Sequence, residues 1–311
     1  MGNTILDRLE KEINILEYGE DNEVKKELLE KIKKLKEKEI NILFVGGTGV
    51  GKSSTINALF NMEVAKVGEI EPETSTINRY PLKNLILWDT PGLGDDPEKD
   101  KRYGEDIVRL LKKKKDGEFL IDEVVLIIDG SNRDMGTSYE ILEKIILPNI
   151  NKERVTIAIN QCDMVMKGRN WNKDEKKPTP QLEEVLNEKV ESIKKRIYES
   201  LDIELEPIFY SALYHYNISK LLFEILKKVD EEKRFILADN LNTNSEIWKS
   251  NDKKEKYNQV IKRETNTSLL RAIYGMKKGA KIGAKIGQVI PIVGRVIGSV
   301  IGGAIGFLAN L

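Results

Sequence analysis

The spacing of hydrophobic residues changes character near residue 40. Residues 3–38 carry apolar side chains at helical spacing among many charged ones, which predicts two short amphipathic helices broken near residues 19–22. Such helices would pack against the next domain or bind a partner. From residue 40 onward, almost uncharged runs alternate with helical stretches, as in a parallel sheet whose strands are buried on both faces. The expected strands are residues 40–45, 85–88, 124–128, 155–159 and 207–210, with an additional edge strand at 77–82.

Helical patterns separate these runs and predict an open α/β sheet with helices on both faces. A polar stretch at 164–180 closes with two prolines and predicts a long loop after a strand end, where open α/β sheets place binding sites. The expected helices of the sheet domain lie near residues 52–60, 104–115, 137–147, 181–200 and 217–229. We divide the chain into a helical arm at 1–38, an α/β domain at 39–230, a helical linker at 231–270 and a tail at 271–311.

A glycine-rich motif follows the first predicted strand and precedes a predicted helix. The segment GGTGVGKS at 46–53 matches the pattern G-x-x-x-x-G-K-[ST]. Its glycines let backbone N–H groups turn toward phosphate oxygens, and the start of the helix adds partial positive charge. Lys52 would reach the β- and γ-phosphates, and the Ser53 hydroxyl would bind Mg²⁺. The residues expected to contact the nucleotide here are Gly47, Thr48, Gly49, Val50, Gly51, Lys52, Ser53 and Ser54.

A second motif, Asp-Thr-Pro-Gly at 89–92, directly follows the predicted strand at 85–88. A carboxylate at a strand end beside the phosphate motif would hold Mg²⁺ through water, and Asp89 has this place. The Gly92 amide would approach the γ-phosphate because no side chain intervenes. The motif lies 37 residues after Lys52, which makes it a strong second indication of a phosphate site.

A third motif, Asn-Gln-Cys-Asp at 160–163, ends the predicted strand at 155–159 and indicates the choice of base. The carboxylate of Asp163 would accept from N1–H and N2–H₂ of guanine, a donor pair that adenine does not offer, so an ATPase is disfavoured. Asn160 would brace the loop, and Gln161 would cover the base with its aliphatic stem. Ser211 and Ala212 would supply a backbone N–H to guanine O6.

These four elements in order, GGTGVGKS, DTPG, NQCD and SA, resemble the Era-like GTPases of the translation-factor class, in particular the bacterial GTP-binding proteins grouped with ribosome-binding GTPases. A weaker similarity to immunity-related GTPases rests on GKSS-x-IN-x-L and W-D-x-P-G. The resemblance covers about residues 40–229 and implies a P-loop NTPase G domain that binds GTP and hydrolyses it slowly with Mg²⁺. It also implies that Thr74, or its neighbour Thr76, is the switch threonine and joins Ser53 and Asp89 at the metal. Lys52 and Thr74 are the expected catalytic residues.

Two positions depart from the pattern of the family, and a third differs from Ras-type enzymes. Gln161 stands where the family usually has Lys, so we expect modestly weaker binding with guanine still preferred. Gly49 replaces the Asn of potassium-activated members, which argues against stimulation by potassium. Leu93 stands where Ras-type enzymes place a water-orienting Gln, so turnover should be slow, on the order of 10⁻⁴ to 10⁻² s⁻¹. A backbone amide, another switch residue or a partner, such as a second copy of the chain, would supply the missing group.

Charge and rare residues exclude several classes of function. The chain has 51 basic and 51 acidic residues, but six basic residues and no acidic one follow Glu264, so the tail is +6 and the rest is −6. A uniform nucleic-acid surface, and with it a ribosomal role, is therefore disfavoured. One cysteine and one histidine exclude an internal disulfide and disfavour a His-based triad. The N-terminus lacks the apolar segment of a secretion signal, so we expect a cytoplasmic protein.

Glycines recur every four residues in the tail, at 279, 283 and 287 and again at 294, 298, 302 and 306. Each series forms a smooth strip on one helix face and allows close helix–helix approach. The expected shape is a helical hairpin that bends near Pro291, with a second arm at 292–310 about 28 Å long, near the thickness of a bilayer core. The tail would bind or enter an anionic membrane, form oligomers or pack against the chain's own helices, or be cleaved or disordered.

Three hypotheses of function follow. The first is a GTP-hydrolysing switch that attaches to a membrane, peripherally or integrally, through residues 271–311. The second is a scaffold with negligible turnover whose GTP state controls self-assembly through the glycine zipper. The third is a membrane-damaging effector in which the G domain gates the tail.

Overall fold

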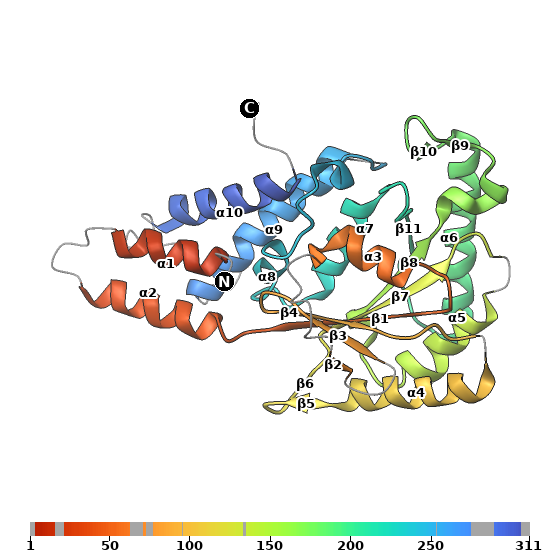
Figure 1. The fold of residues 1–311 in the computed structure, drawn as a ribbon, viewed down its shortest axis with the longest axis horizontal. Helices are drawn as coiled ribbons and strands as arrows, with labels where there is room; N and C mark the ends of the chain where they lie inside the picture. Colours follow the sequence, from red (N-terminus) through yellow and green to blue (C-terminus); the bar gives the residue numbers. More distant parts are fainter. Residues whose placement is uncertain are drawn as a thin grey trace.

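The structure is a computed structural model that describes residues 4–15, 22–62, 71–72, 77–94, 96–132, 135–252, 254–274 and 289–305 of the 311-residue chain. Two parts share these residues: an α/β domain around one large sheet, and a group of helices at one end of it (Figure 1). The second part, called the helical unit below, is made of α1, α2, α8, α9 and α10 and combines segments from both ends of the chain.

The large sheet has seven strands in the order β11-β8-β7-β1-β4-β3-β2. Its parallel strands are confirmed at the five predicted places, and the predicted edge strand is present as well. Every residue of β1, β4 and β8 is buried because helices cover both faces, which explains the nearly uncharged runs. The parallel strands are β1 (Ile40–Gly46), β4 (Leu85–Asp89), β7 (Glu123–Asp129), β8 (Val155–Asn160) and β11 (Ile208–Phe209). The antiparallel edge consists of β3 (Asn78–Pro81) and β2 (Glu71–Pro72).

Alternate residues of β1 separate the core into two halves. Ile42 and Phe44 join the half that also contains α3 (Lys52–Leu59), α7 (Ile218–Lys228) and the helical unit. Leu43 and Val45 join the half beneath α4 (Pro97–Lys112), α5 (Gly136–Glu140), the π-helical turn η2 (Ile141–Ile146) and α6 (Pro180–Leu201). Side chains of a strand alternate between faces, so one apolar run serves both halves.

Two local predictions are corrected. The helix predicted at 104–115 begins at Pro97, because Asp96 caps it by accepting from the Glu98 and Lys99 N–H groups, and it ends at Lys112. The two-stranded hairpin of β5 (Lys114–Lys115) and β6 (Glu118–Phe119) follows.

The expected long loop at 164–180 is structured: it includes most of the 3₁₀ segment η4 (Cys162–Gly168) and the hairpin of β9 (Trp171–Asn172) and β10 (Lys177–Pro178). A further 3₁₀ turn, η3 (Lys152–Arg154), precedes β8.

The helical unit joins both ends of the chain. It contains α1 (Ile5–Ile15), α2 (Asn22–Leu35), α8 (Phe235–Ala238), α9 (Lys254–Tyr274) and α10 (Val289–Ile305), with the 3₁₀ turn η5 (Ser245–Trp248) beside them. Helix α10 lies along α1, as Figure 1 shows, and contacts α9 and η5 as well. Arg295 pairs with Glu12, and Arg8 donates to the Ser299 hydroxyl, so α1 and α10 run antiparallel.

A single apolar face of α10 makes this packing. Its buried residues are Ile292, Val293, Val296, Ile297 and Ile301, and all belong to the main hydrophobic cluster. Gly294 is exposed, and a Cβ placed on it would meet nothing within 4 Å. At this level of α10 the contact with neighbouring helices is therefore made by the branched side chains and not by the glycine. Pro291 lies in the first turn of α10, where its missing N–H costs no hydrogen bond, and the helix continues through the position expected for the bend.

The first arm of the predicted hairpin falls largely on residues 275–288, which lie outside the described residues. Residues 306–311 of the second arm also lie outside them. Among the described helices, none combines the length and the apolar character needed to cross a membrane.

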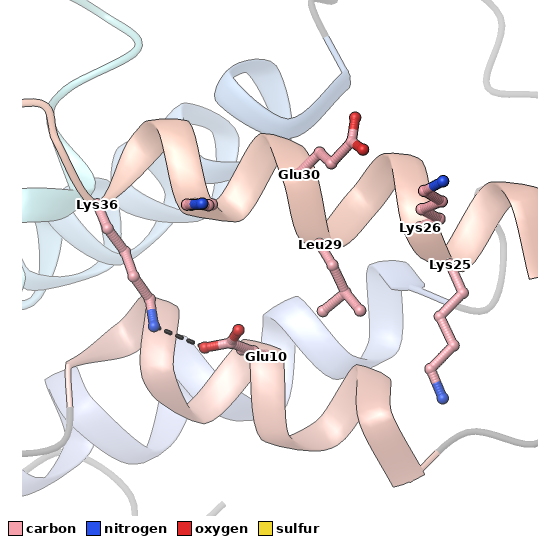
Figure 2. Close-up of a pocket in the computed structure, with 7 residues that line it drawn as sticks. Glu10, Lys25, Lys26, Leu29, Glu30 and Lys36 are labelled. Carbon is pink, nitrogen blue, oxygen red and sulfur yellow. Dashed lines mark hydrogen bonds and ion pairs between the residues drawn. The ribbon is translucent and has the colours of Figure 1, made fainter.

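A cavity of about 790 Å³ opens between α1 and α2 (Figure 2). Leu29 points into it, and Lys36 crosses it to pair with Glu10. The cavity lies at the opposite end of the molecule from the carboxyl end of β1 (Figure 1), so it belongs to the helical unit and not to the phosphate motif.

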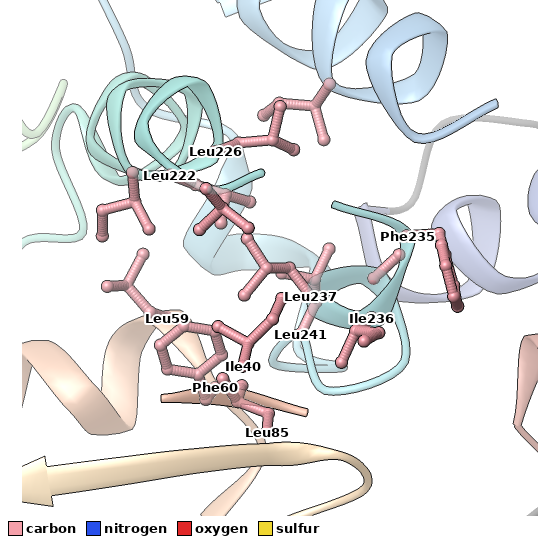
Figure 3. Packing of buried hydrophobic residues seen from close by; sticks show 14 of the residues in the cluster. Ile40, Leu59, Phe60, Leu85, Leu222, Leu226, Phe235, Ile236, Leu237 and Leu241 are labelled. Atoms are coloured by element: carbon pink, nitrogen blue, oxygen red, sulfur yellow. The ribbon is translucent and has the colours of Figure 1, made fainter. Parts of the chain in front are cut away.

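Apolar side chains join the helical unit to the sheet domain. Figure 3 shows Ile236 and Leu237 of α8 beside residues of β1, β4, α3 and α7, with Phe235 on the other side of the same helix. Polar contacts reinforce this junction: the Asn240 side chain accepts from Lys83 N–H and donates to Lys83 C=O, and its backbone carbonyl accepts from Asn61 N–H. The neighbouring Asp239 carboxylate accepts from the Ile5 N–H and so caps α1.

Candidate nucleotide-binding site

The order of the strands brings the motifs together at one edge of the sheet. β1 carries the glycine-rich motif at its carboxyl end and pairs in parallel with β4, which ends at Asp89. On its other side β1 pairs with β7, and β7 pairs with β8, which ends at Asn160. The carboxyl ends of parallel strands lie at the same edge, so residues far apart in sequence surround one space.

The phosphate loop between β1 and α3 has the backbone that its glycines permit. Gly49 has φ +74° and Gly51 has φ +89°, values that other residues rarely adopt. A Cβ on Gly51 would also lie 2.3 Å from Asn160 Nδ2, so glycine is required there for space as well. Helix α3 begins directly at Lys52, so its N-terminus adjoins the loop.

The Lys52 ammonium is held within this loop. Its side chain is 8% exposed, and Nζ donates to the Gly46 carbonyl at 3.1 Å and to the Gly47 carbonyl at 2.9 Å. A buried cation at the start of a helix is a strong site for an anion. Of the other predicted contacts on this loop, Val50 is buried, whereas Thr48, Ser53 and Ser54 are exposed.

Ser53 and Asp89 form the pair expected at a magnesium ion. Ser53 Oγ donates to Asp89 Oδ2 at 2.9 Å, and the second carboxylate oxygen of Asp89 is buried without a partner among the described residues. Burial raises the pKa of Asp89 above its usual value, and the Ser53 hydrogen bond and the Lys52 charge oppose that rise. A hydroxyl beside an unsatisfied carboxylate oxygen suits a hard cation such as Mg²⁺. Thr74 and Thr76 lie outside the described residues.

The segment after Asp89 lies directly on the phosphate loop. A Cβ on Gly92 would fall 2.4 Å from the Thr48 Cα, so only glycine allows this approach. The Leu93 N–H donates to the Gly46 carbonyl at 3.3 Å, and the Thr48 N–H donates to the Leu93 carbonyl at 3.1 Å. Leu93 is buried, and its apolar side chain brings no group that polarises water.

A cavity of about 180 Å³ adjoins Thr48 and Leu93. Asp129, Thr137 and Ser138 also line it, and the sequence patterns did not predict any of the three. A signal was available for Asp129 alone, because it ends β7, the strand directly beside β1.

The base motif is hydrogen-bonded to the phosphate loop. Asn160 Nδ2 donates to the Val50 carbonyl at 2.8 Å, and Asn160 Oδ1 accepts from Ala212 N–H at 3.0 Å. Gln161 Nε2 donates to the Gly49 carbonyl at 2.8 Å, which gives the neutral side chain a definite contact. Asp163 is 4% exposed beside them, and the Ser211 hydroxyl accepts from the N–H of Tyr214. The structure therefore brings the predicted phosphate, metal and base residues of the described segments to one site.

The fold and this set of motifs are those of a P-loop GTPase domain. Residues 41–161, which lie within the sheet domain, match the family described as "50S ribosome-binding GTPase". The resemblance drawn from the motifs is thereby confirmed.

Curated relatives match part of the chain. The uncharacterized protein YkfA of Escherichia coli (strain K12) is 33% identical over 144 residues, which are 45% of this chain and 47% of YkfA. The probable GTP-binding protein EngB of Thermotoga sp. (strain RQ2) is 30% identical over 40% of this chain and 62% of EngB. The chain thus spans about half to three fifths of the length of these relatives. A solved structure of Aquifex aeolicus Era bound to GDP and aluminium fluoride aligns at 20% identity with a TM-score of 0.40, over 62% of this chain and 57% of Era.

Proposed function

We propose that this protein is a GTP-dependent switch that binds GTP and GDP through residues 46–54, 89–92, 160–163 and 211–212 and hydrolyses GTP slowly. One observation carries the proposal: the buried Asp163 belongs to a motif whose Asn160 and Gln161 are hydrogen-bonded to the phosphate loop. A ligand that contacts both motifs must carry a phosphate chain at one end and a base at the other. The carboxylate of Asp163 would pair with guanine rather than adenine.

Each residue would have a distinct part. Lys52 and the amides of the phosphate loop would neutralise the phosphate oxygens, and the Gly92 amide would meet the γ-phosphate. Ser53 and Asp89 would hold Mg²⁺, with Thr74 as the proposed third ligand from the segment outside the described residues. The bound ion would screen the charge that develops between the β- and γ-phosphates.

Hydrolysis would be slow because Leu93 has no polar group for the attacking water. We expect single-turnover rates on the order of 10⁻⁴ to 10⁻² s⁻¹. A rate below this range would favour the alternative of a GTP-dependent scaffold without turnover. The description of the family suggests a ribosomal partner, but the net charge of −6 on residues 1–264 opposes it, and we do not propose one.

The tail has a second, separate proposal. The packing of α10 on α1 and α9 supports the interpretation in which the tail packs against the chain's own helices. Attachment to an anionic membrane through 271–311 and self-assembly through the glycines are the alternatives. Flotation with anionic liposomes and sedimentation, each with the full chain and with residues 1–274, distinguish the three: only membrane attachment floats the full chain, and only self-assembly increases its mass.

The nucleotide proposal is tested by exchanging Asp163 for Asn. The wild-type protein should bind fluorescent GDP at least about 100-fold more tightly than ADP. D163N should lose this affinity and gain affinity for xanthosine diphosphate, because the amide of Asn donates to the C2 carbonyl of xanthine. Equal binding of GDP and ADP by the wild type would contradict the proposal.

A further inference from the structure

A buried pair of hydroxyl groups connects the base side of the site to the phosphate loop. Tyr210 Oη lies 2.6 Å from Thr55 Oγ1, and Thr55 Oγ1 donates to the Gly51 carbonyl at 2.7 Å. Both side chains are 0% exposed. Thr55 has one hydroxyl proton, and the Gly51 carbonyl receives it, so Tyr210 must be the donor to Thr55. Burial raises the pKa of Tyr210, which keeps its hydroxyl protonated and able to donate.

Backbone hydrogen bonds hold Tyr210 against the base motif. Its N–H donates to the Ile159 carbonyl at 2.8 Å, and its carbonyl accepts from the Cys162 N–H at 3.2 Å. Ser211 and Ala212 follow it directly, and Ala212 N–H donates to Asn160. The position of the Tyr210 ring is therefore set by the same segment that we propose to bind guanine.

Three successive carbonyls of the phosphate loop receive side-chain donors, two from the base motif and one from α3. Gln161 donates to the Gly49 carbonyl and Asn160 to the Val50 carbonyl, and Thr55, supported by Tyr210, donates to the Gly51 carbonyl. Across a trans peptide bond, the carbonyl of one residue and the N–H of the next point in opposite directions. The N–H groups of residues 50, 51 and 52 are thus directed away from these donors, into the concave side of the loop where phosphate oxygens bind.

We propose that Tyr210 is a positioning residue of the phosphate loop: its hydroxyl orients Thr55, and Thr55 fixes the peptide between Gly51 and Lys52 so that its N–H points at the β-phosphate. This inference rests on the proposed binding of GTP and GDP. Tyr210 itself does not touch the nucleotide. Hydrogen bonds in series strengthen one another in a buried setting. Removal of the Tyr210 hydroxyl should therefore weaken the hydrogen bond from Thr55 to the Gly51 carbonyl.

The decisive variants change single hydroxyl groups. Y210F removes the outer hydroxyl, T55V removes the inner one, and T55S keeps it. Y216F is the matched control, because Tyr216 is also buried in this loop region, and no hydrogen bond of its hydroxyl to the phosphate loop is present among the described residues. Affinities for GDP, GTP and GMP are measured by competition with a fluorescent guanine nucleotide, and thermal unfolding is followed without nucleotide.

The expected result separates the β-phosphate from the rest of the ligand. Y210F should weaken GDP and GTP equally, by about three- to tenfold, and leave GMP unchanged, because GMP has no β-phosphate. T55V should weaken GDP more than Y210F, T55S should bind like the wild type, and the double variant should be no weaker than T55V because both changes break one chain of contacts.

Two outcomes would overturn the inference. An equal loss for GDP and GMP would assign Tyr210 a general role in stability, and an unchanged GDP affinity in Y210F would show that the hydroxyl does not position the loop. If the wild type binds no guanine nucleotide at all, the proposed function fails first and the inference fails with it. The control Y216F should match Y210F in thermal unfolding to within a few degrees but keep the wild-type ratio of GDP to GMP affinity.

Discussion

The phosphate loop and the helical unit are built in opposite ways. At the phosphate loop, the chemistry lies within one short segment, and Lys52 bonds to carbonyls only five and six positions away. In the helical unit, Arg8 of α1 meets Ser299 of α10 across 291 positions of sequence. Ligand chemistry is therefore concentrated in local motifs, whereas the stability of the helical unit depends on contacts between the two ends of the chain. Variants in the helical unit should therefore leave nucleotide affinity nearly unchanged, and variants in the phosphate loop should leave the stability of the helical unit nearly unchanged.

The largest effect should follow Lys52→Ala, which removes the cation of the phosphate loop. We expect affinity for GDP to fall about 100-fold, because hydrogen bonds to charged groups contribute most in a buried site. Isothermal titration measures this loss, and Lys227→Ala on the exposed side of α7 is the control that should bind like the wild type. Near-normal binding by K52A would show that the nucleotide binds elsewhere.

The second effect concerns the other region. Ile297 of α10 is 0% exposed, so Ile297→Ala should lower the free energy of unfolding by about 2 to 5 kcal/mol and leave GDP affinity within about twofold. Ile15 at the end of α1 is 69% exposed, and Ile15→Ala should change stability by less than about 0.5 kcal/mol. Urea denaturation compares the pair. A stability of I297A equal to that of I15A would mean that α10 is not packed on α1 in solution.

A third effect comes from Asp239, which caps α1 at the junction of the two regions. Burial raises its pKa to about 7, against the partial opposition of the Ile5 N–H, Lys83 and Arg8. The folded protein then binds more protons at this group than the unfolded chain between about pH 4 and pH 7, so its contribution to stability falls as pH rises through that window.

Asp239→Asn cannot ionise and still offers an oxygen to the Ile5 N–H. The variant should therefore gain stability relative to the wild type as pH rises from about 4 to about 7, with no further change above it. Denaturation midpoints at pH 4.5, 6 and 8 measure the gap between the two proteins. A gap that stays constant with pH would contradict the raised pKa.

The smallest effect should follow Gly294→Ala on the exposed side of α10. A methyl group there meets nothing within 4 Å, and Ala is a better helix former than Gly, so stability should rise by up to about 1 kcal/mol. Sedimentation of the same variant tests the glycine strip. If the strip forms close contacts between molecules, the added methyl group would weaken self-association, and that result would favour the scaffold hypothesis.

Much of the site was accessible from the sequence because its signals are local. The motif at 46–53 lies between a buried strand and a helix, and Asp89 and Asn160 each end a strand of apolar residues. Parallel strands align their carboxyl ends, so this information alone predicts that the motifs meet. The local features that were missed, such as the Asp96 cap that starts α4 early, depend on one hydrogen-bonded turn that an apolar pattern does not reveal.

The amino-acid pattern alone was enough to predict the class of the protein, the edge of the sheet that carries the site, and the phosphate, metal and base residues of that site in the described segments. Three features became visible only in the folded chain: α10 packs along α1, its branched residues form the contact while Gly294 faces outward, and Tyr210 reaches Thr55. The physical reason is that helical spacing predicts an apolar face but not the surface that covers it. That choice depends on which shapes fit together in the folded chain, and those surfaces come from opposite ends of the sequence.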